Sequence, residues 1–170
     1  IGERALRESD FKKISPLGRV PVLVDGDLTL HESGAIIQYL LAKYSSGFLE
    51  KEPTDSNFHQ YLQWFHFAEG MIMPPLNTIV VETVLLSPDR KNETNVRRAT
   101  KILGQILQTV ENRLCEVEYL AGEFTAADIM SGHALIMSAH HGVDLNEKPK
   151  CKRYIDKLMS RPQLQKAWSL

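Results

Sequence analysis

The hydrophobic pattern of this chain changes period once along its length, and this change restricts the folds that the chain can adopt. Residues 20–24 and 28–30 are two short runs of strand-forming residues around an Asp-Gly-Asp turn at 25–27, which predicts a β-hairpin. From Ser33 the apolar residues recur with the period of a helix, and Ser33 itself is placed as the N-cap. From Thr54 onward every segment has a helical pattern. The chain is therefore expected to combine a small α/β module with an all-α domain.

The same pattern divides the chain into three parts. Residues 1–44 contain the hairpin and its helix, residues 45–53 have no apolar period and are expected to form a linker, and residues 54–170 form the helical domain. Hydrophobic residues make up 43% of the chain, which is enough for a substantial core. Pro21 lies inside the first strand-forming run, and because proline donates no ladder hydrogen bond, it marks a strand start, an edge or a bend.

Charge and composition argue against several classes of partner. The chain has 20 Lys and Arg residues against 21 Asp and Glu residues, so we expect no broad electropositive surface for nucleic acid. No apolar run approaches the roughly 20 residues that cross a bilayer, so no membrane partner is expected. Cys115 and Cys151 are far apart and belong to no C-x-x-C motif, which favours reduced thiols in a cytoplasmic protein over a zinc or redox site.

The most specific local signal starts a helix near residue 125. Thr125 and Asp128 form a capping box in which Asp takes the place of the usual Glu or Gln, and Phe124 and Ile129 have the spacing of a hydrophobic staple. Because such residues satisfy backbone donors at a buried helix start, we interpret Thr125 and Asp128 as structural rather than catalytic. Gly142 suits the position that follows the end of this helix.

The first helix expected in the helical domain has two apolar faces, so it needs two partners. The second of these faces, formed by Trp64, Phe67 and Met71, favours a dimerisation surface. Pro74 and Pro75 follow, and they are expected to kink or interrupt the helix.

Four motifs in this order resemble those of cytosolic glutathione transferases. They are PLGRVPVL at 16–23, ESGAI at 32–36, FTAAD at 124–128 and SRP at 160–162. The resemblance implies a thioredoxin-like domain that is partial here, followed by the all-helical C-terminal domain of that family. Too few residues precede the hairpin to hold the family's first strand, catalytic loop and first helix. We therefore expect the residue that activates the glutathione thiol, a Tyr, Ser or Cys, to be missing from this chain through deletion or cleavage.

The resemblance also implies a glutathione site. The proline matching Pro21 is cis in that family, and the main chain of Val20 would then hold the cysteinyl part of glutathione; a trans edge proline is the alternative. Ser33 at a helix N-terminus would bind the γ-glutamyl carboxylate, and Glu32 would meet the amino group. Alternatively, Ser33 is only an N-cap and Glu32 only a favourable charge near the helix dipole. Arg19 would reach the glycyl carboxylate, or it is simply solvated.

An apolar pocket for the second substrate is expected on the first helix of the helical domain. Its candidate lining residues are Tyr61, Phe65, His66, Glu69 and Met73, although apolar residues at this spacing are more often core. His66 and Glu69 share a helix face, so they could bind a metal or move a proton. The alternative is a domain or subunit interface, and no metal cofactor is predicted.

Together these features predict a glutathione transferase that acts in the cytoplasm in detoxification. It would bind glutathione as co-substrate, conjugate the thiolate to a small hydrophobic electrophile and form a homodimer. The alternative is a module of the same fold that has no catalytic activity and serves in binding, regulation or dimerisation.

Overall fold

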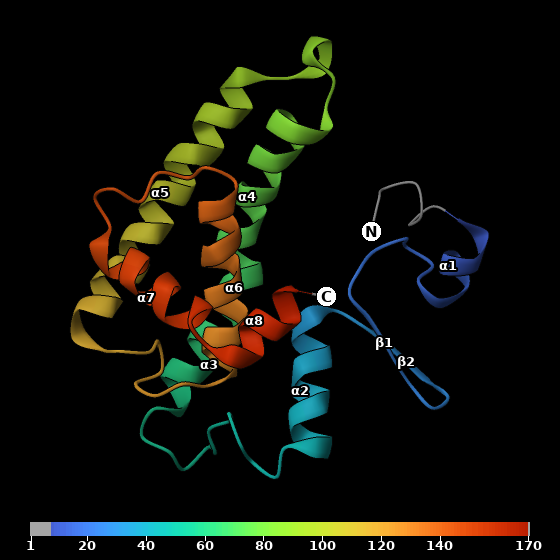
Figure 1. The fold of residues 1–170 in the computed structure, drawn as a ribbon, viewed down its shortest axis with the longest axis vertical. Helices are drawn as coiled ribbons and strands as arrows, with labels where there is room; N and C mark the ends of the chain where they lie inside the picture. Colours follow the sequence, from blue (N-terminus) through green and yellow to red (C-terminus); the bar gives the residue numbers. More distant parts are fainter. Residues whose placement is uncertain (1–7, 170) are drawn as a thin grey trace. The chain divides into compact units, whose positions relative to one another are not determined.

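The computed structural model describes residues 8–169, which form two compact units with their boundary between Leu49 and Glu50 (Figure 1). This boundary falls inside the segment 45–53 that lacks an apolar period. Residues 1–7 of the predicted first module and Leu170 of the predicted helical domain lie outside the described residues.

The first unit contains one β-hairpin and two helices. Its elements in chain order are α1 (Ser9–Ile14), β1 (Val22–Asp25), β2 (Leu28–His31) and α2 (Ser33–Tyr44). The strands are antiparallel, and their register pairs Val22 with His31 and Asp25 with Leu28. The predicted hairpin and the helix that follows it are therefore confirmed.

Two details of this unit differ from the sequence prediction. Strand β1 begins at Val22 rather than Val20, because Pro21 has no N–H with which to extend the ladder. Helix α1 lies in a segment for which no helix was expected. It is only six residues long and none of its residues is buried, so it leaves no apolar stripe in the sequence.

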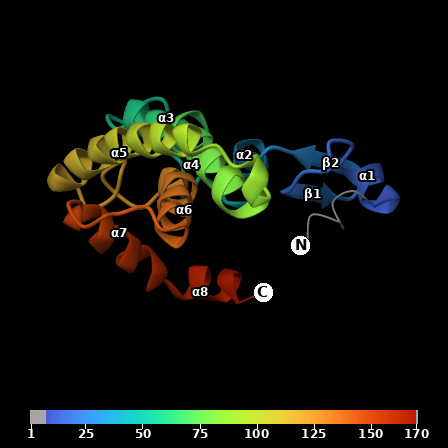
Figure 2. The ribbon, with the colours of Figure 1, turned by 90° about the horizontal axis from the view of Figure 1, so that it is seen from above.

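The second unit is helical. Its elements in chain order are α3 (Phe58–Phe67), η2 (Ala68–Ile72), α4 (Met73–Val80), η3 (Val81–Leu85), η4 (Pro88–Arg90), α5 (Glu93–Glu116), α6 (Ala126–His140), α7 (Pro149–Met159) and α8 (Pro162–Trp168). Helix α6 packs against α3 and η2 and, on its other side, against α7 (Figure 2). Helix α5 packs against α4 and α7, and its residues Leu103, Leu107 and Val110 are fully buried in the core. None of the described helices combines the length and the apolar character that a membrane span requires.

Of the two predicted effects of the proline pair, a kink or an interruption, the interruption does not occur in the helix of residues 58–85. The backbone remains helical, but Ala68–Ile72 forms one wide π turn, and the Met73 N–H donates to the Ala68 carbonyl. Pro74 and Pro75 then occupy the first turn of α4, where their missing N–H groups are least costly. The π turn is the adjustment that accommodates two adjacent prolines within a continuous helix.

The predicted second apolar face of this helix is also not as expected. Trp64 is only 2% exposed and donates through its ring N–H to Gln60 at 3.2 Å, so it belongs to the core. Its ring packs on Phe67 with centroids 4.7 Å apart, and only Met71 of the three residues is exposed. Trp64, Phe67 and Met71 therefore do not form one exposed apolar face through which the chain could dimerise.

Two helical glycines give a matched test of packing. A Cβ atom on Gly132 of α6 would lie 2.4 Å from Leu158 Cδ1 in the core, whereas one on Gly104 of α5 would meet nothing within 4 Å. We expect Gly132→Ala to destabilise the fold by about 1–3 kcal/mol through overpacking. Gly104→Ala should instead stabilise it by about 0.5–1 kcal/mol through helix propensity. Chemical denaturation measures both, and a Gly132→Ala variant as stable as the unmodified chain would contradict the close packing of α6 on α7.

Candidate functional site

The loop before β1 is held by a buried serine. Ser15 is 1% exposed; its hydroxyl donates to the Arg19 carbonyl at 2.8 Å and accepts from the Arg19 N–H at 3.1 Å. These two bonds fix the backbone that leads into Val20, and the Val20–Pro21 peptide bond is cis. In the sequence, a serine followed by turn formers is the only signal of this role for Ser15.

The main chain of Val20 is available to a ligand. The β1–β2 ladder starts at the Val22–His31 pair, and within the described part of the chain neither the N–H nor the C=O of Val20 has a hydrogen-bond partner. The Val20 side chain is also exposed. Unpaired backbone N–H and C=O groups directly before a strand can bind a peptide through main-chain hydrogen bonds.

The start of α2 lies at the same end of the hairpin. Because Val22 pairs with His31, the residues just before β1 and just after β2 are neighbours, which brings Pro21 close to Glu32. Helix α2 begins at Ser33 itself, so Ser33 is the first helical residue and Glu32 occupies the N-cap position; this corrects the prediction that Ser33 is the N-cap. The first backbone N–H groups of a helix have no intrahelical partner and attract anions.

Glu32 has an unusual backbone conformation. Its φ of 72° and ψ of 118° are unfavourable for a residue with a side chain. Its carbonyl accepts from the Ile36 N–H at 2.9 Å, while its exposed carboxylate has no partner among the described residues. Such strain is often found where a side chain is held in place for binding. The carboxylate of Glu32 therefore lies free beside the N-terminus of α2.

The five residues predicted to line an electrophile pocket differ in their burial. Tyr61 and Phe65 are buried in the second unit with ring centroids 5.8 Å apart, and burial raises the pKa of the Tyr61 hydroxyl to about 12. His66 and Glu69 are exposed, and Met73 is half-buried. The helix that carries them packs against α6, and Tyr61 and Phe65 contribute to the core.

A further histidine lies near this group. His133 of α6 has its ring centroid 5.9 Å from that of Trp168 of α8. Desolvation lowers the pKa of His133, and the negative charge of Glu69 opposes this shift. His133, Trp168 and Glu69 come from different helical segments, so no spacing in the sequence could have indicated that they interact. Among residues 8–169 no group of three or more His, Cys, Asp or Glu side chains could hold a metal ion.

The capping box at the start of α6 is present and is more connected than the sequence indicated. The Asp128 carboxylate accepts from the Thr125 N–H at 2.9 Å and, through its other oxygen, from the Leu120 N–H at 2.9 Å and the Tyr154 hydroxyl at 2.7 Å. Burial raises the pKa of Asp128, and these donors oppose that shift. The carboxylate joins α6, the loop before it and α7, which is a structural role.

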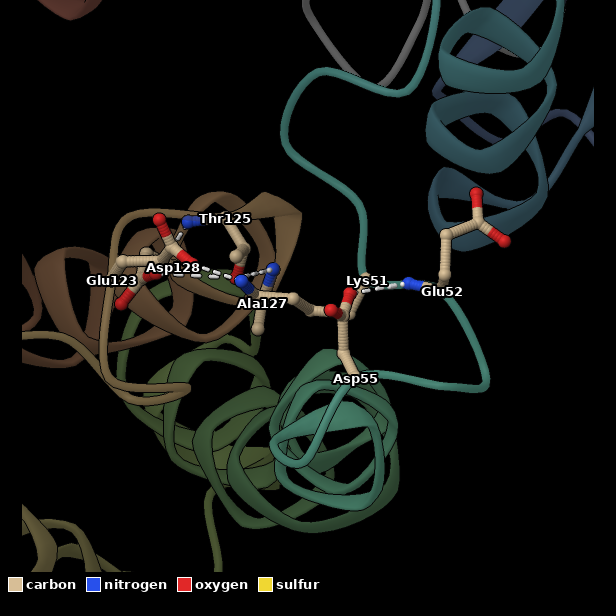
Figure 3. Close-up of polar contacts among 7 residues, drawn as sticks. All are labelled: Lys51, Glu52, Asp55, Glu123, Thr125, Ala127 and Asp128. Carbon is tan, nitrogen blue, oxygen red and sulfur yellow. Dashed lines mark hydrogen bonds and ion pairs between the residues drawn. The ribbon is translucent and has the colours of Figure 1, made fainter.

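The loop before this box is also tied to the first residues of the second unit (Figure 3). The Lys51 ammonium forms an ion pair with Glu123, and the Glu52 N–H donates to the Asp55 carboxylate at 2.8 Å. Phe124 is the residue predicted to form the hydrophobic staple with Ile129. Its ring centroid lies 5.5 Å from that of Tyr119, and the Arg161 guanidinium carbon lies over the Phe124 ring, 3.6 Å from the ring centroid.

Comparisons with known proteins identify relatives of this chain. Residues 3–52 match the family model of the glutathione S-transferase N-terminal domain. The chain is 31% identical over 169 residues to the probable glutathione S-transferase GSTF2 of Oryza sativa subsp. japonica, covering 92% of this chain and 75% of that protein. It is 28% identical over 163 residues to glutathione S-transferase 3 of Schizosaccharomyces pombe, covering 89% of this chain and 67% of that protein. Among solved structures, the glutathione transferase URE2P8 from Phanerochaete chrysosporium with oxidized glutathione matches with a TM-score of 0.83 at 26% identity, over 96% of this chain and 77% of that chain.

Proposed function

The chain belongs to the glutathione transferase family, and we propose that it binds glutathione at the end of the hairpin formed by residues 19–21 and 32–33. Its fold agrees with this family: a thioredoxin-like N-terminal domain with a small two-stranded sheet, followed by a helical domain. The observation that supports the proposal is the strand register: because Val22 pairs with His31, the segment that ends in Val20 and Pro21 and the start of α2 lie at the same end of the hairpin.

Each part of glutathione has a chemical counterpart at this site. The cysteinyl residue has a peptide backbone, which the unpaired N–H and C=O of Val20 would bind as a strand would. The γ-glutamyl carboxylate would accept from the Ser33 hydroxyl and the first N–H groups of α2, and its ammonium would pair with Glu32. Arg19 would pair with the glycyl carboxylate. Ser15, through its two bonds to Arg19, would keep this loop in position.

We propose further that the bound thiolate is transferred to a small hydrophobic electrophile. Among the predicted pocket residues, His66, Glu69 and Met73 are the three that remain accessible to such a substrate, while Tyr61 and Phe65 support them from the core. No described residue is assigned the role of activating the thiol. By analogy with the family, we also propose that the chain forms a homodimer, is located in the cytoplasm and acts in detoxification. We keep the predicted boundaries of the chain's parts: residues 1–44 for the first domain, 45–53 for the linker and 54–170 for the helical domain.

Binding and catalysis can be tested separately. We expect the chain to be retained on immobilised glutathione and eluted by free glutathione. Conjugation of a chloronitrobenzene by the same preparation would support the transferase. Retention without conjugation would favour a module that binds glutathione without catalysis. Absence of retention would contradict the proposed site.

Glu32 gives a prediction in which stability and binding change in opposite directions. Glu32→Gly should relieve backbone strain of about 1–3 kcal/mol at the cost of about 0.5–1 kcal/mol in chain entropy, for a net gain of about 1 kcal/mol. It should also weaken glutathione binding about tenfold, because the ammonium group loses its charged partner. Denaturation and titration calorimetry measure the two effects.

Glu32→Gln is the matched control. It keeps the strained backbone and removes only the charge, so binding should weaken to a similar degree while stability stays within about 0.5 kcal/mol. A Gly variant that is less stable than the Gln variant would show that the conformation of Glu32 carries no strain.

A further inference from the structure

A polar cluster ties the far end of the hairpin to the far end of α2. The Asp25 carboxylate, at the end of β1, accepts from the hydroxyl of Tyr39 at 2.7 Å and that of Tyr44 at 2.5 Å, and from the Lys43 ammonium at 2.9 Å. We call these four residues, Asp25, Tyr39, Lys43 and Tyr44, the Asp25 cluster. No resemblance or motif in the sequence indicated it, because its members are 14 to 19 residues apart from Asp25.

The cluster is more closely connected than an ordinary surface ion pair. The Lys43 ammonium also donates to the Tyr39 hydroxyl at 2.7 Å and lies 5.2 Å from the ring centroids of both Tyr39 and Tyr44. The two rings meet edge to face at 6.4 Å. Three donors hold the pKa of Asp25 well below its usual range, and the same contacts raise the pKa of Lys43. Both shifts favour the carboxylate and ammonium forms, which are the charge states that make these hydrogen bonds.

Its position relative to the proposed glutathione site is informative. That site is at the Val22–His31 end of the hairpin, whereas Asp25 is at the turn end, about 10 Å away along the strand. Lys43 is likewise about 15 Å along α2 from Ser33. Chain connectivity through Glu32 joins the hairpin and α2 at the site end, and the cluster joins them at the other end. Both strands also pack against α2, and the cluster adds a polar attachment at the end away from Glu32, which further restrains the angle between the hairpin and the helix.

We propose that Asp25 is a positioning residue for glutathione binding, which acts by holding the hairpin at a fixed angle to α2. This inference rests on the proposed function. The two halves of the site are on different elements: the Val20 main chain precedes β1, and the N–H groups and Ser33 start α2. Both must meet one tripeptide at once, so their spacing decides the affinity. A site that is already ordered before binding loses less free energy when it binds its ligand.

The test compares two carboxylates of the same turn. Asp25→Asn removes the charge that the cluster shares, while Asp27→Asn removes an exposed charge that has no partner among the described residues. Titration calorimetry with glutathione, well below the melting transition, should give a Kd roughly three- to tenfold higher for Asp25→Asn. The Kd of Asp27→Asn should stay within about 1.5-fold of the unmodified chain, and Tyr44→Phe, which removes one donor, should fall between them.

A second readout does not depend on glutathione. In the unliganded protein, the amide resonances of Val22 and Ser33 should shift in Asp25→Asn and not in Asp27→Asn, and Asp25→Glu should restore both resonances and affinity. Equal affinities and equal spectra for the two Asn variants would overturn the inference.

If the unmodified chain fails to bind glutathione, the proposed function fails, and the amide resonances still decide whether Asp25 sets the geometry of this unit. A variant that does not fold is recognised from its amide spectrum, and Tyr44→Phe then decides.

Discussion

Replacing Asp128 with alanine is expected to destabilise the chain by about 3–5 kcal/mol, a large part of the stability of a domain of this size. Asp128 is 1% exposed, and its removal leaves three buried donors without a partner: the N–H groups of Leu120 and Thr125 and the hydroxyl of Tyr154. Each unpaired buried donor costs about 1–3 kcal/mol. Urea or thermal denaturation followed by circular dichroism measures the loss.

Asp128→Asn should also be clearly destabilising, although it has almost the same shape. Both carboxylate oxygens accept hydrogen bonds, so an amide nitrogen in place of either one would face a donor. Tyr154→Phe removes a single bond and should cost about 1–2 kcal/mol. Asp156→Ala, at an exposed position on α7, is the control and should stay within about 0.5 kcal/mol. An Asp128→Ala variant that unfolds at the same denaturant concentration as this control would contradict the structural role of Asp128.

Replacing Ser33 with alanine is expected to weaken glutathione binding about 10- to 100-fold. Hydrogen bonds to charged groups contribute about 1.5–3 kcal/mol, and the hydroxyl of Ser33 would donate to the γ-glutamyl carboxylate. The backbone N–H groups at the start of α2 remain in the variant, so some binding should persist. Titration calorimetry and elution from immobilised glutathione both measure the effect.

Ser9→Ala is the matched control for this substitution. Ser9 is an exposed serine on α1 in the same unit, and its loss should leave glutathione affinity unchanged within about twofold. Combining Ser33→Ala with Glu32→Gln should remove more affinity than either change, because the two residues bind different groups of the ligand. Equal affinities for Ser33→Ala and Ser9→Ala would exclude a hydrogen bond from the Ser33 hydroxyl to the γ-glutamyl carboxylate.

Much of the fold could be predicted because its signals are local. The hairpin turn, the helix after it and the capping box of Thr125 and Asp128 each depend on residues within a few positions of one another. The errors concern features decided by tertiary contacts or by small backbone adjustments. The π turn before Pro74 and the burial of Trp64 on an apparently outward face are of this kind.

The candidate site was predicted only as far as a resemblance allowed. The residues 19–21 and 32–33 could be chosen by comparison with a family, but their closeness follows from the strand register that pairs Val22 with His31. The Asp25 cluster was missed, because hydrogen bonds between residues 14 to 19 positions apart leave no pattern in one sequence. Ser15 was missed because a serine beside turn formers does not show which backbone groups its hydroxyl will bind. The predicted pocket residues Tyr61 and Phe65 are buried, and helical spacing alone does not distinguish residues that line a pocket from residues of the core.

The most direct test of this account is a glutathione titration followed by amide resonances of the uniformly labelled chain. We predict saturable shifts at Val20, Ser33 and Gly34, where main-chain groups would contact the tripeptide, with a common Kd for all three. Most amides of the helical unit should stay in place. A titration without saturation, or saturable shifts confined to the helical unit, would contradict the assignment of glutathione binding to the end of the hairpin.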